Sequence, residues 1–163
     1  MKKIIAALLL MSMAFTAFAD DKKIEDKEIK QVNLSTESLE GRAKIGLALG
    51  YPLGIVFGYR VANYMEVNAF LGTHFSDFSM GANVLFTIAD INIKDESFPL
   101  SIGPAVYFDF GKDFDMTVLG ILRWEYTFKE IPLNLYIEGG PGFAFIQGFD
   151  FRWSSSLGVR YVF

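Results

Sequence analysis

Apolar and polar residues alternate with a period of two, almost without a break, from Arg42 to Phe163. Successive side chains of a β-strand point to opposite faces, so this period is typical of strands with two different faces. Turn-forming stretches such as PLG, GKD and QGFD divide the segment into runs. There are eight runs, at residues 43–51, 54–61, 64–75, 78–89, 99–110, 115–128, 132–146 and 151–163. Eight short strands at this spacing predict an all-β fold, either an antiparallel barrel or a sandwich.

The two faces of these runs differ in an unusual way. One face is apolar and carries no charge, as at Leu47, Phe57 and Leu122, whereas the other is small, polar and rich in glycine, as at Gly58 and Asn68. The water-facing side of a soluble sandwich would be rich in Lys, Glu, Thr and Gln, and glycine packs poorly on an exposed strand. Small residues suit the inside of a narrow barrel, so we predict that the apolar face points outward.

Aromatic residues gather at the ends of the runs. One level holds Tyr51, Phe75, Phe78, Phe110, Phe151 and Trp153, and the other holds Tyr59, Tyr64, Tyr126, Phe128, Tyr161 and Phe163. Two aromatic girdles around an apolar band are typical of transmembrane β-barrels, whose strands need about 9–11 residues. We therefore predict an eight-stranded antiparallel transmembrane β-barrel over residues 42–163. A secreted sandwich or a lipocalin-like barrel is the alternative.

The N-terminal residues predict export. Lys2 and Lys3 precede a short apolar stretch that ends in an A-x-A site at Ala17–Ala19. This order is typical of a secretory signal peptide, and the stretch is too short for a membrane-spanning helix. We expect residues 1–19 to be removed by cleavage after Ala19. Residues 20–41 are dense in charge and lack aromatic residues, so we expect a flexible periplasmic tail.

Composition excludes several classes of function. The chain has no cysteine, which excludes disulfides and cysteine-based metal sites. Its net charge of −4 gives no indication of nucleic-acid binding. The sequence shows no nucleotide fingerprint and no metal-binding motif, so we expect no cofactor.

The even number of strands predicts that both ends of the barrel segment lie on one side, the periplasm. The outer turns, near residues 51–54, 75–78, 110–115 and 146–151, would then all be short. The longest turn, DINIKDESFP at Asp90–Pro99, would be periplasmic. That arrangement reverses the usual pattern of long outer loops and short inner turns.

The C-terminal residues Leu157-Gly-Val159-Arg-Tyr161-Val-Phe163 carry a resemblance. With the A-x-A signal and the eight alternating runs, they resemble the small eight-stranded outer-membrane barrels of the OmpA/OmpX-like class. The resemblance implies a place in the bacterial outer membrane, in contact with its lipid and lipopolysaccharide. It also implies that Leu157, Val159, Tyr161 and Phe163 form the signal that the barrel assembly machinery reads.

Charged residues on the inward face are expected to meet near the periplasmic end of the lumen. They are Lys44, Arg60, Glu66, Arg123, Glu125, Glu138 and Arg160. Buried charges persist in proteins when they are paired. A structural plug of salt bridges is one interpretation, and a gate or narrow polar path for ions or small solutes is the other.

The sequence therefore favours an outer-membrane barrel with a structural role or a narrow, porin-like permeability. A surface adhesin or host-factor binder is an alternative, although short outer turns offer little binding surface. Lipid A modification is a further, less favoured alternative, because the spacing of His74 to Ser76 suggests a deacylase dyad. The period of two places the side chains of His74 and Ser76 in the lumen or a turn, not facing lipid. No acidic residue lies at an adjacent outward position to act with them. We therefore expect that the protein is not an enzyme and has no catalytic residue.

Overall fold

The computed structural model describes residues 27–30, 43–74, 77–93 and 96–163. Over these ranges the chain is all-β, and none of its described segments is a helix long and apolar enough to cross a membrane. The strands are β1 Lys27–Lys30, β2 Ala43–Tyr51, β3 Leu53–Ala62, β4 Met65–His74, β5 Asp77–Ile93, β6 Glu96–Phe110, β7 Phe114–Thr127, β8 Leu133–Ala144 and β9 Asp150–Val162.

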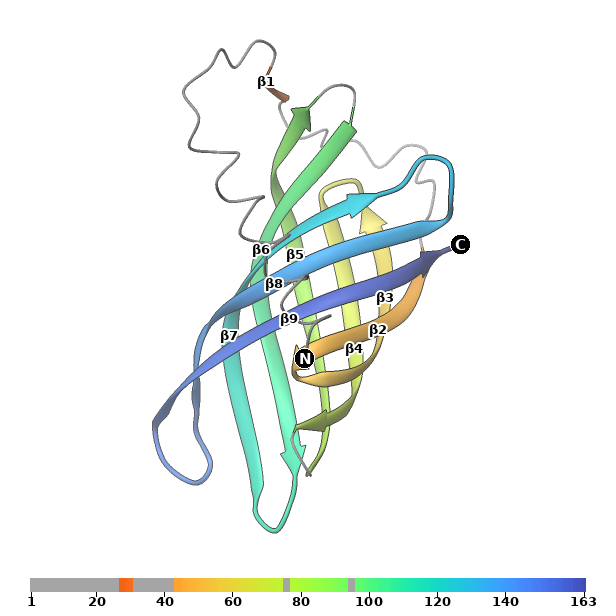
Figure 1. Ribbon diagram of the computed structural model, residues 1–163. Helices are drawn as coiled ribbons and strands as arrows, with labels where there is room; N and C mark the ends of the chain where they lie inside the picture. Colours follow the sequence, from red (N-terminus) through yellow and green to blue (C-terminus); the bar gives the residue numbers. More distant parts are fainter. Residues whose placement is uncertain (1–26, 31–42, 75–76, 94–95) are drawn as a thin grey trace, which may run out of the picture.

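Strands β2 to β9 form a closed antiparallel barrel (Figure 1). Each strand pairs with its neighbours in the sequence, and β9 pairs back onto β2, for example at Ile45 and Tyr161. Closure satisfies the backbone groups of both terminal strands and leaves the barrel wall without an edge. The predicted all-β, eight-stranded antiparallel barrel is thus confirmed as a fold. We call the end that holds Ala43, Phe163 and the β5–β6 turn the termini end, and the other the opposite end.

The Asp90–Pro99 segment differs from its prediction. Instead of a long turn, β5 and β6 continue to pair through it, from Asp90 with Pro99 to Ile93 with Glu96. A register shift between Thr87 and Ala89 marks a bulge below this extension. Asp, Asn and Pro made the segment resemble a turn, yet Ile91 and Ile93 keep the period of two. The result is a hairpin that projects beyond its neighbours, at the top of Figure 1.

Strand β1 lies within the charged segment that we expected to be flexible. Lys27–Lys30 pairs antiparallel with the projecting part of β5, with Ile29 opposite Ile91 and Lys30 opposite Asp90. The rest of the segment, residues 20–26 and 31–41, lies outside the described residues. The expected signal peptide, residues 1–19, and its cleavage site after Ala19 also lie outside them.

The two faces of the wall are as the alternation predicted. Large apolar side chains are exposed around the outside, among them Leu47 at 58% and Leu157 at 46%. The lumen is filled by inward side chains, which is expected because eight strands enclose a space just wide enough for them. One part of it differs from the polar, glycine-rich interior that we predicted. An apolar core cluster occupies the lumen, formed by Ala48, Val56, Phe70, Leu85, Ala105, Tyr107, Leu119 and Ile121.

Aromatic rings cluster on the wall near both ends of the barrel. Near the opposite end, Phe110 packs against Phe78 and Phe114, with ring centroids 5.9 and 5.3 Å apart. In the β8–β9 hairpin, Phe143 stacks on Phe149 at 4.5 Å. The termini end has its own groups, in which Phe98 stacks on Tyr126 and Tyr161 meets Phe163. The apolar outer surface is therefore bordered by aromatic side chains near both ends.

Candidate functional site

Charged side chains from six strands meet in the half of the lumen nearer the termini end. The structure brings together every residue of the predicted lumen cluster: Lys44 of β2, Arg60 of β3, Glu66 of β4, Arg123 and Glu125 of β7, Glu138 of β8 and Arg160 of β9. We call these seven residues the charged layer. Its deepest members are Arg160, which is 0% exposed, and Arg123, which is 1% exposed. Each projects inward because it sits on the inward parity of its strand.

Glu66 accepts from three cations that reach it from other strands. The Nζ of Lys44 lies 2.6 Å from its Oε2, and the Nη1 of Arg160 lies 2.7 Å from its Oε1. The Nη1 of Arg123 approaches the same Oε1 at 3.1 Å. Hydrogen bonds between ionised groups are short and strong, and they gain further strength where water is excluded. Glu66 therefore ties β4 to β2, β7 and β9 across the lumen.

Glu125 forms a second centre of the charged layer. Arg160 Nη2 donates to its Oε2 at 2.7 Å, and Arg60 Nη2 donates to its Oε1 at 2.8 Å. Lys44 Nζ reaches the same carboxylate at 3.3 Å. Because Arg160 and Lys44 each contact both Glu66 and Glu125, the two carboxylates belong to a single network.

Glu138 completes the network on the β8 side. Arg123 Nε donates to its Oε2 at 2.8 Å, and the Ser156 hydroxyl donates to its Oε1 at 3.0 Å. Arg123 thus joins Glu138 to Glu66. Every charged member within the layer has at least one partner of opposite sign, which is the condition for burying such groups.

Tyr136 separates the two most deeply buried arginines. Its ring lies 4.5 Å from the guanidinium carbon of Arg123 and 4.7 Å from that of Arg160, both as cation–π contacts. The ring occupies space left by Gly158, where an added Cβ would lie 2.0 Å from the Tyr136 Cε1. Because Gly158 has no side chain, the Tyr136 ring has room to contact both guanidinium groups.

Two asparagines that the sequence analysis did not single out as site residues accept hydrogen bonds from the charged layer. The Oδ1 of Asn68 accepts from Nη1 of Arg160 at 2.9 Å and of Arg123 at 3.2 Å. The Oδ1 of Asn134 accepts from Arg160 Nε at 2.9 Å. The layer has four basic and three acidic side chains, so one positive charge is in excess. The amide oxygens accept hydrogen bonds from arginine N–H groups that the carboxylates do not fully satisfy. Inward parity was the one signal that could have identified them.

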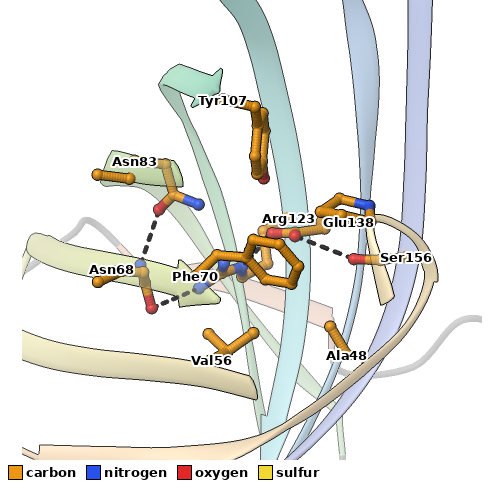
Figure 2. A pocket seen from close by; sticks show the side chains of 12 residues that line it. Ala48, Val56, Asn68, Phe70, Asn83, Tyr107, Arg123, Glu138 and Ser156 are labelled. Carbon is orange, nitrogen blue, oxygen red and sulfur yellow. Dashed lines mark hydrogen bonds and ion pairs between the residues drawn. The ribbon is translucent and has the colours of Figure 1, made fainter. Parts of the chain in front are cut away.

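The charged layer divides the interior space of the lumen. One cavity of about 10 Å³ lies on the side of the apolar core cluster, where Figure 2 shows Asn68, Asn83, Phe70 and Tyr107 around it. A second, also about 10 Å³, lies among Arg60, Glu66, Thr87 and Ser101. A volume of this size holds about one water molecule. Arg123 lines both cavities, so its side chain forms part of the wall between them.

The lumen near the opposite end carries fewer charges. Arg152 Nη2 lies 3.6 Å from Asp115 Oδ2, and Asp109 is paired in register with Asp115. His74 ends β4 opposite Asp77, and its side chain lies outside the described part of the structure, as does Ser76. Among the described residues, no group of three or more His, Cys, Asp or Glu side chains could hold a metal ion.

The residues of the predicted assembly signal lie on the outside of β9 and at its end. Leu157, Val159 and Tyr161 are exposed on the outer wall, and Phe163 is 70% exposed. They alternate with inward Gly158 and Arg160, so one short segment supplies both an apolar outer face and the most buried charge.

Comparison with known proteins gave no match for this chain among protein-family models, curated proteins or solved structures.

Proposed function

We propose that this protein is an integral barrel of the bacterial outer membrane with a structural role, in which the charged layer closes the lumen. The observation that carries the proposal is the inversion of burial. Arg123 and Arg160 are buried, whereas Leu47, Leu122 and Leu157 are exposed on the outer wall. Soluble monomers rarely expose a continuous apolar surface of this extent. A wall that faces hydrocarbon explains it, with aromatic residues bordering the apolar band.

The proposal has consequences for location and partners. The chain is exported by a signal peptide that is cleaved after Ala19, and residues 20–41 then lie in the periplasm. Its outer wall contacts membrane lipid and lipopolysaccharide. The barrel assembly machinery recognises Leu157, Val159, Tyr161 and Phe163. In architecture the protein resembles the OmpA/OmpX-like class, and it acts as neither an enzyme nor a nucleic-acid binder.

Matched arginine substitutions test the membrane proposal. Leu122, in the middle of β7, and Ile131, in the β7–β8 turn, are exposed to similar extents, 46% and 45%. In a membrane, Leu122→Arg costs about 2–4 kcal/mol because it places a charge in the hydrocarbon core, whereas Ile131→Arg near the interface costs at most about 1 kcal/mol. In a soluble barrel both positions face water, and neither substitution changes stability much.

The measurement is urea unfolding of both variants after folding into lipid vesicles. We expect Leu122→Arg to lower the unfolding midpoint and Ile131→Arg to leave it nearly unchanged. The proposal fails if the chain folds to a monomer in buffer without detergent or lipid and both variants keep the same midpoint.

A second candidate function is narrow permeability to ions or small solutes. The two cavities favour it, because they lie on either side of the charged layer and Arg123 borders both. A path between them requires the guanidinium of Arg123 to leave Glu66 and Glu138. Planar-bilayer recordings distinguish the two candidates, since a closed structural barrel gives no discrete conductance steps.

A further inference from the structure

The β5–β6 hairpin leaves the barrel at a defined point. Pairing between β4 and β5 ends at Met65 and Phe86, yet β5 continues to Ile93. The bulge between Thr87 and Ala89 lies where the hairpin separates from the wall. Bulges bend a strand and increase its twist, so they redirect a hairpin away from a sheet. Beyond this point, no barrel strand in the described part of the chain pairs with the edge of β5 that faced β4.

An uncovered strand edge presents a row of unpaired backbone N–H and C=O groups and readily accepts another strand. In this protein β1 covers that edge. Lys27, Glu28, Ile29 and Lys30 pair with Ile93, Asn92, Ile91 and Asp90 in antiparallel register. Figure 1 places β1 beside the tip of the hairpin, away from the rest of the barrel.

Strand β1, which covers this edge, is short and pairs with a single strand among the described residues. Over the described residues β1 pairs with β5 alone, through four residues. An isolated pair of such short strands is marginally stable in water. Residues 31–42 join β1 to β2, so release of β1 breaks no pairing within the barrel itself. These features suit a strand that exchanges with another of similar sequence.

The register indicates what sequence the edge prefers. Ile29 stands opposite Ile91, and Lys30 stands opposite Asp90. Opposed apolar residues and opposed unlike charges each stabilise a pair of antiparallel strands. The Asp90 carboxylate also accepts a hydrogen bond from Ser97 Oγ at 2.6 Å, across the hairpin. A partner segment with a cationic residue opposite Asp90 and an apolar residue beside it, opposite Ile91, would match both positions.

We propose that the edge of β5 at Asp90–Ile93 is a strand-addition site for an extended peptide segment that places an apolar residue opposite Ile91 and a cationic residue opposite Asp90. Strand β1 occupies the site in the isolated chain and competes with such a partner. Binding by strand addition draws affinity from backbone hydrogen bonds and specificity from alternate side chains. The site belongs to the hairpin and not to the outer wall, so it does not depend on membrane insertion.

A disulfide trap tests the occupancy by β1. The chain has no cysteine, so introduced pairs report without background. Ile29→Cys with Ile91→Cys joins positions that are opposed in register, and we expect it to oxidise to a disulfide. Ile29→Cys with Ile88→Cys is the control. Ile88 lies three positions before Ile91, about 10 Å along the strand, which is too far for a disulfide. Absence of the first disulfide overturns the proposal.

Peptide binding to the full-length chain tests the addition in trans. The probe is a fluorescent peptide with the sequence of residues 24–32, measured by anisotropy. The oxidised Ile29→Cys, Ile91→Cys chain should not bind it. A chain with Ile29→Pro and Lys30→Pro should bind at least tenfold more tightly than the unchanged chain, because two consecutive prolines remove whichever N–H faces β5. Equal binding by the locked and the proline chains would overturn the proposal.

Two further outcomes are informative. A probe peptide with the change Lys30→Glu should bind more weakly, and equal affinity would overturn the stated preference for a cation opposite Asp90. If Ile29→Cys, Ile91→Cys forms disulfides between two chains as well as within one, the edge has accepted β1 from a second copy, which supports addition in trans.

Discussion

Arg160 and Glu66 meet across the lumen, with Arg160 Nη1 on β9 lying 2.7 Å from Glu66 Oε1 on β4. Strands β2 and β3 separate β4 from β9 along the wall, so this contact is not between neighbouring strands. Closing the sheet into a barrel is what brings the two side chains together. The pair therefore depends on barrel closure and, once formed, helps to hold opposite parts of the wall at a fixed distance.

Removing the charge of Glu66 should destabilise the barrel. Glu66→Gln leaves Lys44, Arg123 and Arg160 facing a neutral side chain in a buried site, and breaking a buried ion pair typically costs about 3–5 kcal/mol. Glu96→Gln is the matched control, because Glu96 pairs with exposed Lys129 at 3.3 Å, a kind of pair that contributes about 0–1 kcal/mol. The comparison is made by urea unfolding in lipid vesicles. Equal midpoints for the two variants would show that the charged layer does not stabilise the fold.

The space beside Gly158, which the Tyr136 ring fills, gives a second matched pair of substitutions. Gly158→Ala places a Cβ 2.0 Å from the Tyr136 ring, whereas Gly120→Ala on β7 meets nothing within 4 Å. Overpacking a filled interior costs about 1–3 kcal/mol, and here it also moves the ring from between Arg123 and Arg160. We expect thermal unfolding to shift to lower temperature for Gly158→Ala and to change little for Gly120→Ala. A neutral Gly158→Ala would mean that the ring has room to move.

The strands and their faces were predictable from the sequence because both depend on a local pattern. The period of two located the eight strands and placed residues such as Arg123 and Glu138 in the lumen. It did not indicate which base meets which acid. That depends on the stagger of strands around the closed barrel, as the contact between Arg160 and Glu66 illustrates. Asn134 was missed for the same reason, since an amide gains its role from the arginine that the register brings to it.

The projecting hairpin was missed for a different reason. Asp90, Asn92 and Pro99 have strong turn propensity, and this outweighed the alternation of Ile91 and Ile93 in the same stretch. Pairing across the hairpin decided the outcome, because each residue from Asp90 to Ile93 has a partner on β6. Local propensity is a weak guide where a neighbouring strand is available to pair.

Shortening Arg123 should open the lumen. Its side chain lines the cavities on both sides of the charged layer, so Arg123→Ala removes part of the wall between them. We expect no discrete conductance steps from the unchanged chain in planar bilayers, and small steps from the variant. Circular dichroism before reconstitution shows whether the variant is folded, and Arg123→Met, which keeps most of the volume without the charge, serves as the control. Discrete steps from the unchanged chain would instead favour permeability as the function.

Substitution of His74 should leave lipid A unaltered. The residue ends β4 and pairs in register with Asp77, and the sequence offers no outward-facing acid to act with it. A hydrolase acting on lipid needs such a group within hydrogen-bond reach of its histidine. Mass spectrometry of lipid A from cells that express the unchanged chain or His74→Ala should give the same profile. A loss of acyl chains that requires His74 would contradict the prediction that the chain is not an enzyme.

Deletion of Phe163 should impair assembly into the outer membrane. Phe163 and Phe149 are both 70% exposed, so their contributions to folding by burial are similar. They differ in position, because Phe163 ends the segment that resembles the assembly signal, whereas Phe149 lies in the β8–β9 turn. We expect loss of heat-modifiable barrel from the outer-membrane fraction on deletion of Phe163, and normal amounts for Phe149→Ala. Normal assembly without Phe163, or an equal loss in both variants, would show that the terminal aromatic has no specific role in targeting.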